Sequence, residues 1–220
     1  MVNVNFLLVL QVAVYVLTFM LSFCLFVPIC MHLHNFRGHC LLFSSGKWNS
    51  SGQLVMSWSS TFYCTYTIFV GILLMVACAI QIYRLSVFLV RGSDSSFLSA
   101  FIDTVGSAIL AAATFTGAIF ITLGFKAWCD TITTRYISCR DASSNDLGEK
   151  TNIIIPGFYS QIGTAQFAAW GAWVCTIALT VFAILKMCQY HQQANIAVSM
   201  AKERRRLLGE VAGRPATHIR

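Results

Sequence analysis

Charged residues are absent from four long stretches of this 220-residue chain, and their spacing constrains the fold more than any other feature. No Asp, Glu, Lys or Arg occurs in residues 1–36, 48–83, 104–125 or 151–185. Each stretch can hold the roughly 20 apolar residues that a helix needs to cross a bilayer. The whole chain is 57% hydrophobic and 10% charged, against about 45–50% and about 25% in soluble domains. The sequence therefore predicts an integral membrane protein with four crossings.

The apolar runs place the predicted membrane-spanning helices at about residues 6–31, 62–83, 98–123 and 163–185. A cleaved signal peptide is the alternative interpretation of the first run. Such a peptide has a basic start and an apolar core of about 7–15 residues, whereas no Lys or Arg precedes Phe6 and this run is far longer. We therefore expect a retained first span and a four-span membrane domain over residues 1–190. The expected outer loops are about 32–61 and 124–162, and residues 191–220 form a basic tail.

The distribution of Lys and Arg predicts the orientation of the chain. An even number of spans puts both termini on one side, where nine Lys and Arg would lie, against six on the other side. Cytosolic segments carry the excess of positive charge, so we expect both termini in the cytosol, in the plasma membrane or in endosomal or secretory membranes. Asn49-Ser50-Ser51 is a glycosylation acceptor in the first outer loop. A chance occurrence of this common tripeptide is the alternative.

Four cysteines lie in or beside the two predicted outer loops: Cys40, Cys64, Cys129 and Cys139. An oxidising compartment lets such cysteines form disulfides. Four cysteines permit three pairings, and we favour Cys40 with Cys64 and Cys129 with Cys139 because each pair closes one loop.

Two short apolar stretches in the first outer loop, Cys40–Phe43 and Leu54–Met56, flank a Gly- and Ser-containing segment. This pattern is typical of a β-hairpin. An isolated hairpin is marginally stable in water, so we expect it to rest on other outer segments and to be fastened by a disulfide.

Four short motifs, in this order, resemble the transmembrane protein 179 family over most of the chain: Phe36-Arg37-Gly38-His39-Cys40-Leu41-Leu42-Phe43, Ser96-Phe97-Leu98-Ser99-Ala100-Phe101, Trp128-Cys129-Asp130-Thr131-Ile132-Thr133, and Phe158-Tyr159 followed by Gln161 and Ala165-Gln166-Phe167. The resemblance fades after about residue 190. It implies a claudin-like fold, in which a left-handed bundle of four transmembrane helices lies beneath a small extracellular β-sheet. It also implies that the family's four extracellular cysteines correspond to Cys40, Cys64, Cys129 and Cys139. The chain lacks the Trp, Gly-Leu-Trp, Cys, Cys pattern of claudins proper, which argues against tight-junction strand formation.

The closest approach to a metal-binding pattern is His32, His34 and His39 beside Cys40. Structural zinc sites usually have four protein ligands, and Cys40 is the expected partner of Cys64. We therefore interpret the histidines as an interfacial cluster and predict no metal and no cofactor.

Asp103 is the acidic residue inside a predicted span. Intramembrane ionisable residues are functional hypotheses by default, but Asp103 lies about one turn from the expected cytosolic end, within reach of water, Arg84 or Arg91. We favour a structural, hydrogen-bonded role over proton or cation transport.

Small residues recur at spacings of four, from Ala113 to Gly117 and from Ala168 to Ala172. This spacing allows helices to approach closely in a membrane. Packing within the chain is the favoured interpretation, and a partner helix is the alternative.

The segment after the fourth span turns basic at Lys202–Arg206, and such clusters near a membrane are drawn to anionic lipid. Glu203, Leu207 and Leu208 also fit the acidic, Leu-Leu pattern of endocytic sorting signals, although a solvated basic face is the default. Cys188 is a candidate for palmitoylation, and an unmodified thiol is the alternative.

The sequence contains no phosphate-binding Gly-rich loop, no Ser, His and acid set and no pair of facing carboxylates, so we predict that the protein is not an enzyme. Its positive charge lies mainly in the tail, which indicates lipid head groups and not nucleic acid. The leading hypothesis is a non-catalytic accessory or scaffolding partner that modulates a channel, a receptor or a trafficking step, with contacts through helix faces or the outer sheet. A small oligomeric channel or transporter and a cell–cell adhesion protein are the alternatives.

Overall fold

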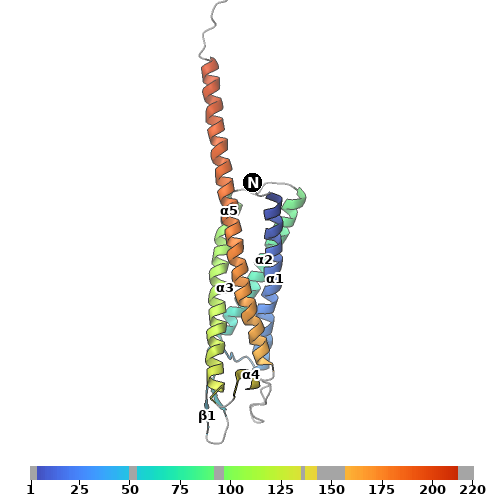
Figure 1. Cartoon of the computed structure of the whole chain (residues 1–220), viewed down its shortest axis with the longest axis vertical. Coiled ribbons are helices and arrows are strands. Elements are labelled where there is room, and N and C mark those ends of the chain that lie inside the picture. The colour runs from blue at the N-terminus through green and yellow to red at the C-terminus, as the bar shows by residue number, and fades with distance from the viewer. Residues whose placement is uncertain (1–3, 50–53, 92–96, 135–136, 143–156, 213–220) are drawn as a thin grey trace, which may run out of the picture.

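A computed structural model of the chain describes residues 4–49, 54–91, 97–134, 137–142 and 157–212. Its elements are α1 (Val4–Asn35), β1 (Ser45–Trp48), β2 (Leu54–Ser57), α2 (Phe62–Arg91), α3 (Phe97–Ile132), α4 (Cys139–Ala142) and α5 (Phe158–Ala212). The four long helices form an elongated bundle, with the strands at one end and α5 projecting from the other (Figure 1). We call these the hairpin end and the tail end.

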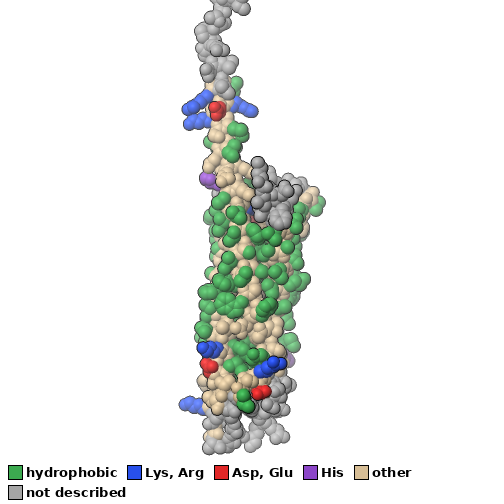
Figure 2. Space-filling view, in the orientation of Figure 1, with side chains coloured by type: hydrophobic (Ala, Val, Ile, Leu, Met, Phe, Trp, Pro, Cys, Tyr) green, Lys and Arg blue, Asp and Glu red, His purple; other side chains and the backbone are tan. Residues whose placement is uncertain are grey.

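All four long helices are apolar and long enough to cross a membrane. Hydrophobic side chains are spread over the visible face of the bundle between its two ends (Figure 2), as expected where lipid replaces water as the solvent. The predicted integral membrane protein with a four-helix bundle and a small sheet is therefore confirmed.

The helices are longer than the predicted spans. α1 continues to Asn35, α3 continues to Ile132 and α5 begins at Phe158, so helical structure extends into both predicted outer loops. The 55 residues of α5 correspond to about 80 Å at 1.5 Å per residue. The helix therefore runs without a break from the bundle into the predicted tail.

The hairpin is present, but its first strand begins at Ser45, later than the apolar stretch Cys40–Phe43 predicts. β1 pairs with β2 in antiparallel register, with Lys47 opposite Val55, whereas Cys40–Phe43 forms a turn. Leu41 and Leu42 are buried in the bundle, and Phe43 has a positive φ of 61°. The Phe43 N–H donates a hydrogen bond of 3.2 Å to the Gly124 carbonyl of α3. Those residues are apolar because they enter the core, not because they alternate along a strand.

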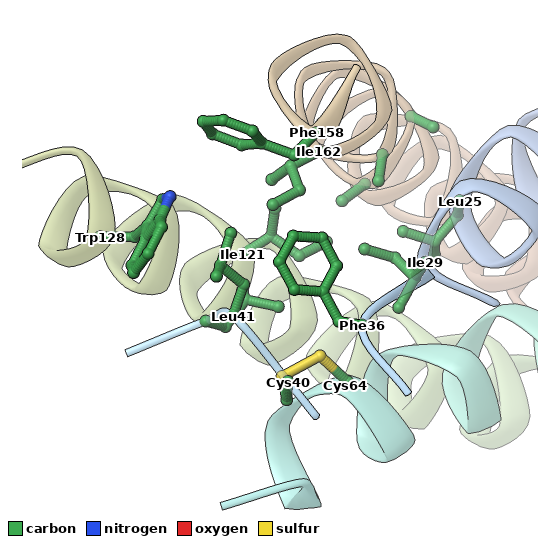
Figure 3. Close-up of a cluster of buried hydrophobic side chains, with 14 of the residues drawn as sticks. Leu25, Ile29, Phe36, Cys40, Leu41, Cys64, Ile121, Trp128, Phe158 and Ile162 are labelled. Carbon is green, nitrogen blue, oxygen red and sulfur yellow. A yellow bond between two sulfur atoms is a disulfide. The ribbon is translucent and has the colours of Figure 1, made fainter. Parts of the chain in front are cut away.

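The largest core cluster lies at the hairpin end (Figure 3), where side chains from all four long helices meet the Cys40–Leu42 turn. Phe36, Trp128 and Phe158 are its largest buried members. Disulfides join Cys40 to Cys64 and Cys129 to Cys139, with S–S distances of 1.95 Å and 2.06 Å. The first connects the turn to α2 and the second connects α3 to α4, as the favoured pairing predicts.

Small residues bring the helices close together inside the chain. Ala168 and Ala172 of α5 are both 0% exposed, and a Cβ added to Gly71 of α2 would lie 2.8 Å from the Cβ of Phe26 in α1. Such spacing lets backbones approach closely where apolar burial gives no driving force between helices. Packing within the chain therefore occupies the Ala168–Ala172 face, which is not available to a partner helix.

Candidate functional site

An ion pair between α2 and α3 lies near the tail end of the bundle. Arg84 Nη1 lies 2.7 Å from Asp103 Oδ1, and Gln81 Nε2 donates a hydrogen bond of 2.7 Å to the same carboxylate oxygen. Arg84 also donates to the Gln81 Oε1 at 3.2 Å and to the Ser99 Oγ. The structure thus assigns Arg84 as the cation that reaches Asp103.

The two members of this ion pair differ in how far they are buried. Asp103 lies six residues after the start of α3 at Phe97, which is about 9 Å along the helix. The Asp103 side chain is 15% exposed and the Arg84 side chain is 41% exposed. The carboxylate is therefore mostly buried and is neutralised by a more exposed cation, as expected for an intramembrane acid that pairs with another charged group.

Gln81 and Ser99 also belong to this cluster, although neither was predicted as a site residue. Gln81 is the one amide side chain between residues 62 and 83, and its spacing of three from Arg84 puts both on the same helix face. That spacing was a usable signal. Nothing in the sequence indicates that Ser99, in a different helix, contacts Arg84.

Hydroxyl groups along α3, which are candidates for a polar pathway, donate to carbonyls of their own helix. Thr104 Oγ1 donates to the Ala100 carbonyl at 2.8 Å, and Ser107 Oγ donates to the Thr104 carbonyl at 3.0 Å. Thr114 and Thr116 make the same kind of bond to carbonyls three or four residues earlier. This pattern satisfies hydroxyls inside helices.

The three histidines near the hairpin end point to different surroundings. His32 is fully buried and packs on Phe36, with ring centroids 4.4 Å apart. The His39 ring stacks on Trp58, with centroids 4.7 Å apart, and His34 lines a shallow surface depression. Within the described ranges, no three His, Cys, Asp or Glu side chains are grouped as metal ligands.

The surface of the hairpin end carries the predicted glycosylation residue. Asn49 directly follows β1 and is exposed, and Ser50 and Ser51 of the acceptor tripeptide lie outside the described residues. Val55 of β2 is 60% exposed. This end therefore presents both a candidate modification residue and an exposed apolar side chain.

The predicted tail is the projecting part of α5, where Lys and Arg side chains cluster (Figure 2). Lys202, Glu203, Arg204, Arg205 and Arg206 are exposed, as are Leu208 and the free thiol of Cys188.

The side chain of Leu207 lies outside the described part of the chain. Glu203 and Leu208 of the candidate sorting signal, and Cys188 of the candidate palmitoylation site, are exposed at the tail end.

Comparison with protein families gives one match that spans most of the chain. Residues 7–208 match the family model described as Transmembrane protein 179/179B Claudin domain. No solved structure matches the chain.

Proposed function

Because this chain belongs to the transmembrane protein 179/179B claudin family, we propose that it is a non-catalytic accessory protein that associates laterally with other membrane proteins. The expected partner is a channel, a receptor or a component of membrane trafficking.

The observation that carries the proposal is the fastened hairpin end. Two disulfides and a buried aromatic cluster hold the outer segments against the helices. A surface that is already ordered loses less conformational entropy when it binds a partner. The exposed Val55 of β2 is an apolar contact point on that surface.

The charged and polar groups inside the bundle support a non-catalytic role. Asp103 is engaged by Arg84 and Gln81, so we assign it a structural role as an anchor between α2 and α3. His32, His34 and His39 have separate surroundings. Catalysis by acid and base needs such groups to face one reacting atom.

An oligomeric channel has less support. Its candidate polar residues, Thr104, Ser107, Thr114 and Thr116, donate to carbonyls of their own helix. A conduction pathway built on Asp103 would also require its ion pair to open. Purified protein in liposomes is therefore expected to pass no ion above the empty-liposome level, and Asp103→Asn is expected to leave that result unchanged.

The proposal includes the orientation and the modifications. Both termini lie in the cytosol, in the plasma membrane or in endosomal or secretory membranes, and Asn49 carries a glycan on the opposite side. The basic residues from Lys202 to Arg206 contact anionic lipid. Glu203, Leu207 and Leu208 act as a sorting signal, and Cys188 is palmitoylated.

The decisive experiment isolates the full-length protein from native membranes in mild detergent. The expected result is co-isolation of another membrane protein at a fixed stoichiometry. Recovery of the chain only with itself would contradict the accessory function. Clustering at contacts between expressing cells, without a lateral partner, would favour adhesion instead.

A matched pair of variants tests whether the hairpin end is the contact surface. Val55→Lys puts a charge on the exposed apolar position of β2, and we expect it to reduce the co-isolated partner. Ser45→Lys adds the same charge at an exposed position on the neighbouring β1 and should retain the partner. An equal loss in both variants would count against a contact centred on Val55.

A further inference from the structure

A cavity of about 300 Å³ lies inside the bundle next to the Arg84–Asp103 ion pair. Its walls come mainly from α2 and α3, and α1 and α5 close its back through Tyr15, Thr176 and Leu179. Those three side chains are each less than a tenth exposed. Its volume is at the lower end of the range for small-molecule sites, about 300–1,000 Å³.

Polar and apolar groups occupy different parts of the cavity. Gln81, Arg84 and Asp103 line the part nearest the tail end, whereas Leu74 and Leu110 line the part deeper in the bundle. Ser107 and Thr176 also line the cavity, but their hydroxyls donate to carbonyls of their own helices. Leu74 and Arg84 are ten residues apart on α2, which is about 15 Å along a helix. This length is about half the roughly 30 Å hydrocarbon core, so the cavity spans about one leaflet.

The cavity opens sideways. Ile80 of α2 and Ile102 of α3 line it, yet they are 53% and 59% exposed, so they form its outer rim. A Cβ added at Gly106, another lining residue, would meet nothing within 4 Å. A molecule that enters here comes from the lipid phase between α2 and α3.

The polar part of the cavity has unused hydrogen-bonding capacity. Asp103 Oδ1 accepts from both Arg84 and Gln81, and no hydrogen bond to Oδ2 comes from the described residues. A guanidinium has five N–H groups, so Arg84 retains donors beyond those bonds. The site therefore fits a group that both donates and accepts.

We propose that this cavity binds a sterol, with its hydroxyl between Asp103 and Arg84 and its fused rings against Leu74 and Leu110. A hydroxyl donates to the carboxylate and accepts from the guanidinium through a single atom. A rigid ring system also loses little conformational freedom on binding.

The charge balance of the cavity disfavours an anionic phospholipid. Arg84 and Asp103 neutralise each other in its lining, and a phosphate would lie beside the Asp103 carboxylate. The Lys186 Nζ lies over the rings of Phe88 and Tyr190, outside the lining, although it is close enough to interact electrostatically with Asp103 and Arg84.

The test uses the full-length protein in phosphatidylcholine nanodiscs with a photoreactive cholesterol analogue. We expect crosslinks on the rim residues Ile80 and Ile102 that excess cholesterol removes. Cholestenone, which has a ketone in place of the hydroxyl, should compete at least about tenfold more weakly, because a site built around a hydroxyl rejects an analogue without it. Equal competition by the two sterols would overturn the proposal.

Two leucine substitutions test the position of the sterol. Gly106→Leu fills the cavity and should lower labelling about tenfold, since its side chain takes volume that the ligand needs. Gly163→Leu is the control, because a Cβ at Gly163 in α5 also meets nothing within 4 Å but lies outside the cavity lining. Unchanged labelling in Gly106→Leu would overturn the proposal, and the cholestenone comparison stands if that variant does not fold.

Competing lipids identify the source of the ligand. Diacylglycerol also has a hydroxyl, phosphatidylethanolamine has an ammonium group and phosphatidylserine is anionic. We expect none of them to displace the analogue at the concentration at which cholesterol does. Displacement by any of them in preference to cholesterol would overturn the sterol assignment. The labelling and competition experiments need no protein partner, so their outcome is independent of the accessory function.

Discussion

Arg84 on α2 and Asp103 on α3 form an ion pair, with 2.7 Å between Nη1 and Oδ1. Their helices run in opposite directions, so Arg84 is near the end of α2 and Asp103 is near the start of α3. The pair therefore joins the two helices close to the segment that connects them. Gln81 adds a second hydrogen bond to the same carboxylate oxygen.

Removal of the cation should destabilise the bundle. Arg84→Met leaves the partly buried Asp103 carboxylate without its cation, which costs about 1–3 kcal/mol for an unsatisfied group. We expect a lower midpoint of SDS-induced unfolding in mixed micelles. The double variant Arg84→Asp, Asp103→Arg restores an ion pair, so it should lose less stability than the sum of the losses in its two single variants. If the two single losses instead add to the loss in the double variant within about 0.5 kcal/mol, the residues are not coupled.

A side chain at Gly71 should separate α1 from α2. The added Cβ of Gly71→Ala would lie 2.8 Å from the Cβ of Phe26, and such overpacking costs about 1–3 kcal/mol. SDS unfolding measures this loss. Gly163→Ala is the control, because its Cβ would meet nothing within 4 Å and Ala is favoured over Gly in a helix by about 1 kcal/mol. Equal destabilisation by both changes would contradict the close approach.

The two disulfides should differ in their resistance to reduction. Cys40 and Cys64 are both 0% exposed, whereas Cys139 is 9% exposed, so a mild reductant should open Cys129–Cys139 first. Replacement of both Cys40 and Cys64, which are 24 residues apart in the sequence, by Ser should cost about 3.5 kcal/mol in the chain-entropy account. Alkylation and peptide mapping at increasing reductant concentration measures the order. Earlier opening of Cys40–Cys64 would contradict the burial argument.

Glycosylation and proteolysis should report opposite sides of the membrane. We expect a glycosidase to lower the apparent mass of the wild-type protein, and Asn49→Gln should remove that shift. The exposed Lys202–Arg206 segment should be cut by trypsin in intact cells only after permeabilisation. Cleavage of the tail without permeabilisation would reverse the proposed orientation.

The sequence pattern predicted the four membrane helices, each of which is surrounded by hydrocarbon or by apolar side chains along most of its length. A membrane helix must satisfy its backbone internally and face hydrocarbon, so a charge-free apolar run is enough to locate it. The helices themselves continue past the apolar spans, because residues such as Ile132 lie beyond the span but are buried in the core cluster at the hairpin end. The first strand was mispredicted for a related reason: Cys40–Leu42 is apolar because it packs in the core, not because it belongs to a strand.

For the candidate site, the sequence identified Asp103 as the intramembrane acid and offered Arg84 as one possible partner. It could not select between Arg84 and Arg91, because that choice depends on how α2 is rotated against α3. The contacts of Gln81 with Asp103 and of Ser99 with Arg84 also depend on that rotation. The small-residue spacings were evident, but only the packing showed that the Ala168–Ala172 face is occupied within the chain.

The sequence by itself determined four membrane crossings and the sorting of charge toward the two ends, because the cost of placing charge in hydrocarbon depends on composition along the chain. The tertiary structure decided the Arg84–Asp103 contact, the buried turn at Cys40–Leu42 and the cavity beside Gly106. Each of these depends on the rotation and separation of helices, which follow from side-chain packing between segments far apart in the sequence.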